Sequence, residues 1–181
     1  MQFYYHNRLW RLIMKKVWAF VVVGLLIGSA AWAVDVQISA SVANRLSVAI
    51  EHLTWNLTID NTGAEVTQNS IDNLTVISSK KNYKVSFSSS DNGNLKMTVS
   101  GTDYLIPYKI KVDTSSWSEG VDTNDLDTYV QLNGAKKIVF IKRTPAVGKV
   151  FPIGIQIPEY LNEIYEDGTY TATLTIDITA S

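Results

Sequence analysis

Residues 170–178 read YTATLTIDI, and this stretch decides the fold class that the sequence predicts. Its even-numbered residues are apolar, whereas its odd-numbered residues are Thr or Asp. Because successive side chains of an extended chain point to opposite faces, this period of two predicts a β-strand with one buried face. The Asp-Gly pair at 167–168 predicts a turn immediately before the strand.

Similar strand patterns fill most of the chain after residue 34. Turn-forming residues separate them, most clearly DNTG at 60–63 and DNGN at 91–94. No segment has the period of a long amphipathic helix. The other strands predicted between these turns are residues 46–50, 53–59, 74–76, 83–87, 95–99, 104–112, 136–142 and 150–157. Many short strands with frequent turns predict an all-β fold, an antiparallel β-sandwich.

Three stretches interrupt the strand pattern. Pro107 lies inside residues 104–112 and, since proline donates no ladder hydrogen bond, it predicts an edge strand, a bulge or a strand start. Residues 113–128 are rich in Ser, Thr, Asp, Asn and Gly, which predicts a long loop or an irregular crossing. Residues 158–166 have room for one short helical turn.

The first 33 residues have the organisation of a signal peptide. Four basic residues precede or open an apolar run from Val17 to Ile27, and Ala31-Trp32-Ala33 forms an A-x-A cleavage pattern. Met14 is an alternative start, so residues 1–13 lie upstream of the protein if translation begins there. An uncleaved membrane anchor is the other interpretation, but the 17 residues from Val17 to Ala33 are short for a span of about 20. We therefore expect export to the periplasm, the cell surface or the medium.

Composition limits the partners of the exported chain, residues 34–181. Its 148 residues suit one domain, and its formal charge is −5, from 12 basic and 17 acidic residues. It has no Lys/Arg stripe, which argues against nucleic acid and anionic lipid surfaces as partners. It also has no Cys, so no disulfide stabilises it.

Few residues of the exported chain suit catalysis or metal binding. His52 is its single histidine, and we interpret it as a surface or turn residue rather than a catalytic base. Asp122, Asp125 and Asp127 lack the Gly and the distal Glu of an EF-hand loop, so a solvated acidic loop is the better interpretation. We therefore expect no enzyme, no cofactor and no metal site.

Residues 34–42 read VDVQISASV and begin where the processed chain would begin. Every even position is apolar and every odd position is polar or charged. The pattern predicts a strand with one sticky face at a free N-terminus. Such a strand suits donation to a neighbouring molecule, and it equally suits the first strand of its own sandwich.

Three stretches of the chain carry a resemblance to a known family. They are residues 36–42, residues 82–87 followed by 105–113, and residues 166–178 with their Gly-Thr-Tyr strand. Together they resemble the spore coat protein U domain and, more broadly, the subunits of chaperone–usher pili.

The resemblance implies an incomplete, immunoglobulin-like sandwich that lacks its last strand. A neighbour's N-terminal strand would then fill the exposed groove, with like subunits, a periplasmic chaperone and an outer-membrane usher as the implied partners. Head-to-tail contacts of this kind do not close, so they build fibres. By the match, residues 34–43 are the donor strand, residues 44–181 are the sandwich, and the groove-filling side chains are Val34, Val36, Ile38, Ala40 and Val42.

Two functions follow as hypotheses. The first is an exported structural subunit of a pilus or coat-like polymer, assembled by strand exchange. The alternative is a monomeric secreted or cell-surface binding module for carbohydrate or protein, with Trp117 and Tyr129 near the 113–128 loop as the possible ligand contacts. The sequence leaves open whether the first strand pairs within its own domain or with another copy.

Overall fold

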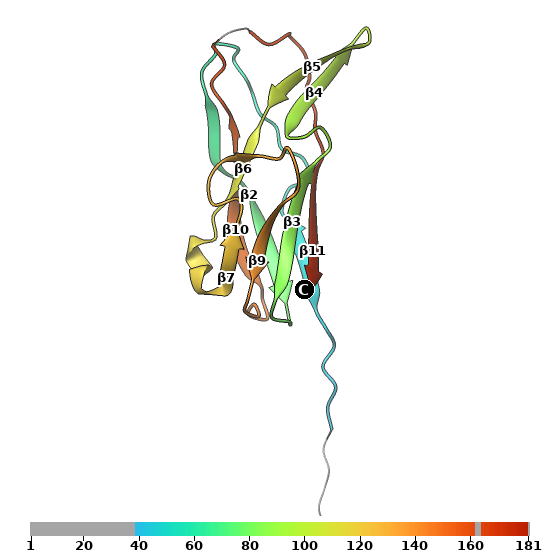
Figure 1. Cartoon of the computed structure of the whole chain (residues 1–181), viewed down its shortest axis with the longest axis vertical. Coiled ribbons are helices and arrows are strands. Elements are labelled where there is room, and N and C mark those ends of the chain that lie inside the picture. The colour runs from blue at the N-terminus through green and yellow to red at the C-terminus, as the bar shows by residue number, and fades with distance from the viewer. Residues whose placement is uncertain (1–38, 162–163, 181) are drawn as a thin grey trace, which may run out of the picture. The chain divides into compact units, whose positions relative to one another are not determined.

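The computed structural model describes residues 39–161 and 164–180. Within them, a compact unit that begins at Val42 is built from antiparallel strands and one short 3₁₀ helix, which confirms the predicted all-β sandwich (Figure 1). The predicted signal peptide and three predicted donor residues, Val34, Val36 and Ile38, lie outside the described residues. No helix in the described ranges is long and apolar enough to cross a membrane.

Two sheets form the layers of the sandwich. The first has the order β1-β2-β10-β6-β8, with bounds β1 Leu46–Ile50, β2 Val66–Ser78, β10 Lys149–Ile157, β6 Lys109–Val112 and β8 Val130–Gln131. The second has the order β11-β3-β9-β7, with bounds β11 Leu174–Ala180, β3 Tyr83–Ser89, β9 Lys136–Phe140 and β7 Val121–Asn124. A separate two-stranded hairpin consists of β4 Asn94–Val99 and β5 Thr102–Pro107.

The core lies between the central strands of the two sheets. Inward residues alternate with outward ones, as Val85 and Phe87 of β3 and Leu74 and Val76 of β2 show, and all four are fully buried. Phe140 is at the centre of an aromatic group, with its ring 4.9 Å from Tyr83, 5.9 Å from Trp117 and 5.7 Å from Phe151. Stacked rings of this kind add to the stabilisation that burial alone gives.

Pro107 divides the stretch that the sequence predicts as one strand, residues 104–112. It is the last residue of β5, opposite Asn94, and the chain enters the first sheet only at Lys109. The single predicted strand is therefore wrong, whereas an interruption at Pro107 is what its missing N–H predicts.

Residues 113–128 are more ordered than a loop. They contain the 3₁₀ helix η1, Ser115–Gly120, and then β7, which pairs with β9. Trp117 and Leu126 lie in the core, and their burial explains why this polar segment is held against the sandwich. The short helical turn expected in residues 158–166 does not occur in 158–161 or 164–166.

Candidate functional site

The two sheets leave a pair of edges side by side. β1 is the outer strand of the first sheet and pairs with β2, while β11 is the outer strand of the second and pairs with β3. β1 lies beside β11, yet no ladder of hydrogen bonds joins them in the described part of the chain. Each of these outer strands therefore keeps one edge of unpaired N–H and C=O groups, and the sandwich is open just beyond the two strands, between residues 51–59 and 165–173.

One wall of the opening is the segment that follows β1. Trp55, Leu57 and Ile59 face the core and stay half-buried, while the residues between them are exposed. The segment thus has the alternation of a strand, as the sequence predicts for 53–59. It belongs to no sheet, however, so its prediction as a paired strand is wrong.

The opposite wall is the segment that leads into β11. Tyr170 and Ala172 continue the half-buried face of Leu174 and Ile176, but the ladder with β3 begins only at Leu174. Ahead of Leu174, Thr171 exchanges two backbone hydrogen bonds with Lys96 of the β4–β5 hairpin, at 2.8 and 2.9 Å. The predicted strand 170–178 is therefore partly correct, and its first residues line the opening instead.

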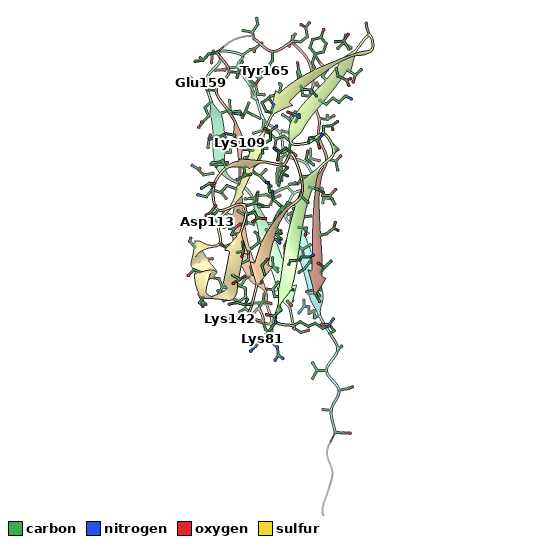
Figure 2. All side chains as sticks on the ribbon, in the orientation of Figure 1. Lys81, Lys109, Asp113, Lys142, Glu159 and Tyr165 are labelled. Carbon is green, nitrogen blue, oxygen red and sulfur yellow. The ribbon has the colours of Figure 1, made fainter. Side chains whose placement is uncertain are left out.

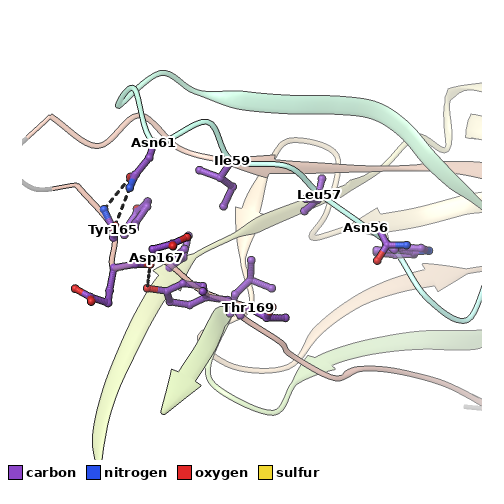
Figure 3. Close-up of a pocket in the computed structure, with 13 residues that line it drawn as sticks. Asn56, Leu57, Ile59, Asn61, Tyr165, Asp167 and Thr169 are labelled. Carbon is purple, nitrogen blue, oxygen red and sulfur yellow. Dashed lines mark hydrogen bonds between the residues drawn. The ribbon is translucent and has the colours of Figure 1, made fainter. Parts of the chain in front are cut away.

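Between these walls lies a groove made of two adjoining hollows of about 310 and 410 Å³. Figure 3 shows the first of them, with Leu57 and Ile59 on one side and Thr169 and Tyr165 on the other. Apolar side chains from β1, β4, β5 and β10 and from the residue between β5 and β6 also contribute to the lining, namely Ile50, Leu95, Ile106, Ile155 and Tyr108. We call this opening, lined by residues 50–59 and 165–174, the edge groove.

Asn61 ties the two walls together at the end of the edge groove. Its side-chain amide donates to the carbonyl oxygen of Tyr165 at 2.7 Å and accepts from the Tyr165 N–H at 2.9 Å (Figure 3). The Tyr160 ring packs on Tyr165 with 4.1 Å between centroids, and the Tyr160 N–H donates to the carbonyl of Gly63. This end of the groove therefore has a fixed width.

Asp72 fixes the start of the first wall. Its buried carboxylate accepts hydrogen bonds from the backbone N–H groups of Glu51, His52 and Asn73, and from the Trp55 indole at 2.7 Å. Burial raises the pKa of the Asp72 carboxyl, but the hydrogen bonds from Trp55 and the three N–H groups outweigh burial, so the pKa is lowered from its ordinary value. The charged Asp72 thus holds the bend that directs residues 53–59 along the groove.

Glu51, His52 and Asp72 form a candidate metal-binding group, since their ligand atoms lie within 4.8 Å of one another. The Asp72 oxygens already accept four N–H donors, and the exposed His52 ring stands 3.5 Å from Asp72 Oδ1. Because four N–H donors already occupy the carboxylate, we assign Asp72 a structural role. The sequence could have indicated its burial, since Asp72 lies on the same inward face of β2 as Leu74 and Val76.

The remaining predicted site residues lie apart from one another. Trp117 is 5% exposed and stacks on Phe140 and Phe151, whereas Tyr129 is at the surface and donates from its hydroxyl to Asn69 at 3.0 Å. Neither lines the edge groove. Of the predicted donor residues, Ala40 and Val42 are exposed and belong to no sheet, with Val42 91% exposed.

The scan against protein-family models finds no match for this chain, and the search of curated proteins finds no relative.

Proposed function

We propose that this protein is an exported, non-enzymatic structural subunit of a pilus or coat-like surface polymer, in which residues 34–42 of one copy occupy the edge groove of another. The observation that carries the proposal is the groove itself. Its walls, residues 53–59 and 165–173, belong to no sheet and carry half-buried apolar side chains such as Leu57, Ile59 and Tyr170 among polar ones. An added strand would pair with backbone groups at the edges and cover the lining with alternate side chains.

The donor and the groove match in pattern, and the donor is long enough to cover the wall. Nine extended residues, 34–42, span about 30 Å, whereas the seven residues 53–59, which follow the bend held by Asp72, span about 23 Å. Val34, Val36, Ile38, Ala40 and Val42 would all point toward the lining if one of them does. At about 0.8 kcal/mol for each buried CH₂, these five side chains would contribute several kcal/mol to the association.

Contacts just before β1 favour exchange between copies. The Ser79 N–H donates to the Arg45 carbonyl at 2.8 Å, which extends the β1–β2 ladder by one residue. The Arg45 N–H donates back to Ser79 Oγ, and its guanidinium donates to the Ala146 carbonyl. To enter the groove of its own domain, the chain would have to reverse within residues 43–45 while these bonds hold Arg45 in line with β1.

A matched pair of substitutions tests the proposal in protein recovered after export. Ile38→Asp puts a charge on the face that would meet the groove, whereas Ser39→Asp puts the same charge on the opposite face. We expect Ile38→Asp to give folded monomers and Ser39→Asp to assemble as the wild type does, measured by size-exclusion chromatography. Assembled protein should also resist SDS without heating. Equal assembly of both variants would refute the proposal.

The alternative, a monomeric binding module, makes the opposite prediction for the same experiment. Wild-type protein would then be a monomer, and a deletion of residues 34–43 would destabilise the domain because its own first strand is lost. In the exchange proposal the same deletion leaves the domain folded and able to bind a synthetic peptide of residues 34–43.

A further inference from the structure

The two ends of the sandwich carry opposite charge. Six exposed basic residues lie at the end where β2 finishes and β3 begins, and we call this the basic end: Arg45, Lys80, Lys81, Lys84, Lys142 and Arg143. Five exposed acidic residues lie at the end where β2 begins and β10 finishes, and we call this the acidic end: Asp60, Glu65, Glu159, Glu166 and Asp167.

The strands place these ends far apart. β2 runs from the acidic end to the basic end, and its 13 residues correspond to about 43 Å. β10 runs the other way, from Lys149 to Ile157. Figure 2 shows Lys81 and Lys142 together at one end of the sandwich and Glu159 at the other.

The charges at both ends are available for a partner. The ion pairs among the described residues are His52–Asp72 and Lys96–Asp103, and neither involves a residue of the two ends. Two acids, Glu119 and Asp122, lie near the basic end, because the Gly120 carbonyl between them accepts a hydrogen bond from Ile141 and Val121 pairs with Phe140. The six basic residues outnumber these two acids, so the basic end keeps an excess of positive charge.

Each end also leaves large apolar side chains in solvent. Leu161 and Ile164 at the acidic end are 78% and 77% exposed, and Val147 at the basic end is 85% exposed. Exposed apolar residues rimmed by charges are a common feature of protein contact surfaces. A contact between the two ends would cover apolar side chains from both copies.

We propose that successive copies meet end to end, with the basic end of one copy against the acidic end of the next. The occupant of each end is thus a second copy of this chain. This inference rests on the proposed strand exchange, because Arg45 of the basic end follows the donor segment, residues 34–43, after one intervening residue. The donor copy's basic end follows its donor strand in the chain. It therefore lies at the end of the acceptor copy where the donor strand leaves the groove.

The charges then select the direction of the donor strand. β1 runs from the basic end toward the acidic end, and β11 runs back. If the donor is parallel to β1, Val42 lies at the acidic end of the acceptor, and unlike charges meet. If it is antiparallel to β1, the two basic ends face each other and repel.

Charge reversal tests the contact, with assembly of exported protein followed by light scattering. Lys80→Glu with Lys81→Glu should slow assembly at least about tenfold at low salt, and Glu159→Lys with Glu166→Lys should do the same. The substitutions lower the formal charge of the six basic residues from +6 to +2 and that of the five acidic residues from −5 to −1. The four substitutions in one chain weaken both ends, so the fourfold variant should assemble as slowly as the slower double variant, or more slowly. All differences should shrink between about 50 and 200 mM salt, as the screening length shortens.

Lys109→Glu with Lys111→Glu is the matched control, because it changes the net charge equally on β6, between the ends. It should assemble at nearly the wild-type rate. A wild-type rate at low salt in either single-end variant, or in the fourfold variant, would overturn the end-to-end contact.

A synthetic peptide of residues 34–43 separates this inference from the proposed function. The peptide lacks the basic end, so its affinity for the groove should be the same in all these variants. If the peptide binds but charge reversal has no effect, the end contact is wrong and strand exchange stands. If the peptide does not bind wild-type protein with residues 34–43 deleted, strand exchange itself is wrong.

Discussion

The central strands and the edge strands of this sandwich share one side-chain pattern and differ in how far it is buried. Val85 and Phe87 of β3 are fully buried, whereas Ile176 and Ile178 of the neighbouring β11 stay partly exposed on the same face of the sheet. Both strands alternate strictly, so amphipathic character does not explain the difference. The two strands differ in their neighbours, because β3 is paired with a strand on each side, whereas β11 is paired on one side only.

This comparison separates residues that stabilise the domain from residues that would contact a second copy in the proposed assembly. An inward side chain on a central strand is already removed from water, so its loss weakens the folded state. A half-buried side chain of the edge groove, such as Leu57, would complete its burial only in the proposed assembly, where the groove is filled. Substitutions of inward residues on the central strands should therefore mainly lower the stability of the domain. Substitutions of edge-groove residues should mainly weaken assembly.

The largest expected effect is that of Phe140→Ala in the central strand β9. Phe140 is fully buried and contacts three other aromatic rings, so its truncation leaves a cavity that the sandwich cannot fill. We expect the free energy of unfolding to fall by about 3–5 kcal/mol, measured by urea denaturation of monomeric protein. If Phe140→Ala lowered the free energy of unfolding as little as the truncation of a half-buried groove residue does, the distinction between central-strand and edge-groove residues would be wrong.

Asp72→Asn should have the next largest effect, because it weakens hydrogen bonds that start the groove wall. We expect a loss of about 1–3 kcal/mol in the free energy of unfolding at neutral pH. The pKa of Asp72 is lowered in the folded state, so the charged form contributes stability above the unfolded pKa of about 3.9, and this stability is lost as the pH falls through the lower, folded value.

The difference between wild type and Asp72→Asn should accordingly begin to shrink below about pH 4, where the carboxyl of the unfolded chain becomes protonated, and should vanish once the folded carboxyl is protonated at its lower pKa. Denaturation curves at several pH values give this profile. His52→Gln is the control, since the exposed ring contributes little while the His52 N–H still donates to Asp72. A difference that is constant with pH would contradict the role given to the charge.

The sequence predicted strands correctly where an alternating segment both buries one face and pairs with a neighbouring strand. Residues 46–50 and 83–87 alternate, and they are the paired strands β1 and β3. Residues 53–59 alternate equally well but have no partner in this chain, and alternation reports only which face is apolar. Trp117 is surrounded by polar residues in sequence, yet it is buried because the η1 turn brings it over Phe140 and Phe151.

The edge groove was not predictable from any local pattern in the sequence. Its lining comes from segments about 110 residues apart, such as Leu57 and Tyr170, and no local pattern shows that these approach each other. Asp72 and Asn61 fix the walls through contacts with distant backbone groups. Side-chain-to-backbone bonds of this kind depend on the final arrangement of the chain rather than on spacing.

Leu57→Ala should affect assembly more than stability. Leu57 lines both hollows of the edge groove and is only half-buried in the free domain. We expect a loss of about 1 kcal/mol or less in unfolding free energy, and roughly tenfold weaker binding of the 34–43 peptide, since the truncation removes apolar contact from the filled groove. Thr58→Ala, on the exposed face of the same segment, should change neither quantity.

The smallest expected effect is that of Lys96→Gln in the β4–β5 hairpin. Lys96 pairs with Asp103 at 2.6 Å, but both side chains are well exposed, and water and salt screen such a pair. The backbone of Lys96, rather than its side chain, holds the hairpin against the groove wall, because it exchanges two hydrogen bonds with Thr171. The unfolding midpoint should therefore stay unchanged in Lys96→Gln, whereas Thr171→Pro, which removes the N–H that donates to Lys96, should lower it and weaken peptide binding. If the two substitutions had equal effects, the side-chain ion pair rather than the backbone contact would hold the hairpin against the groove.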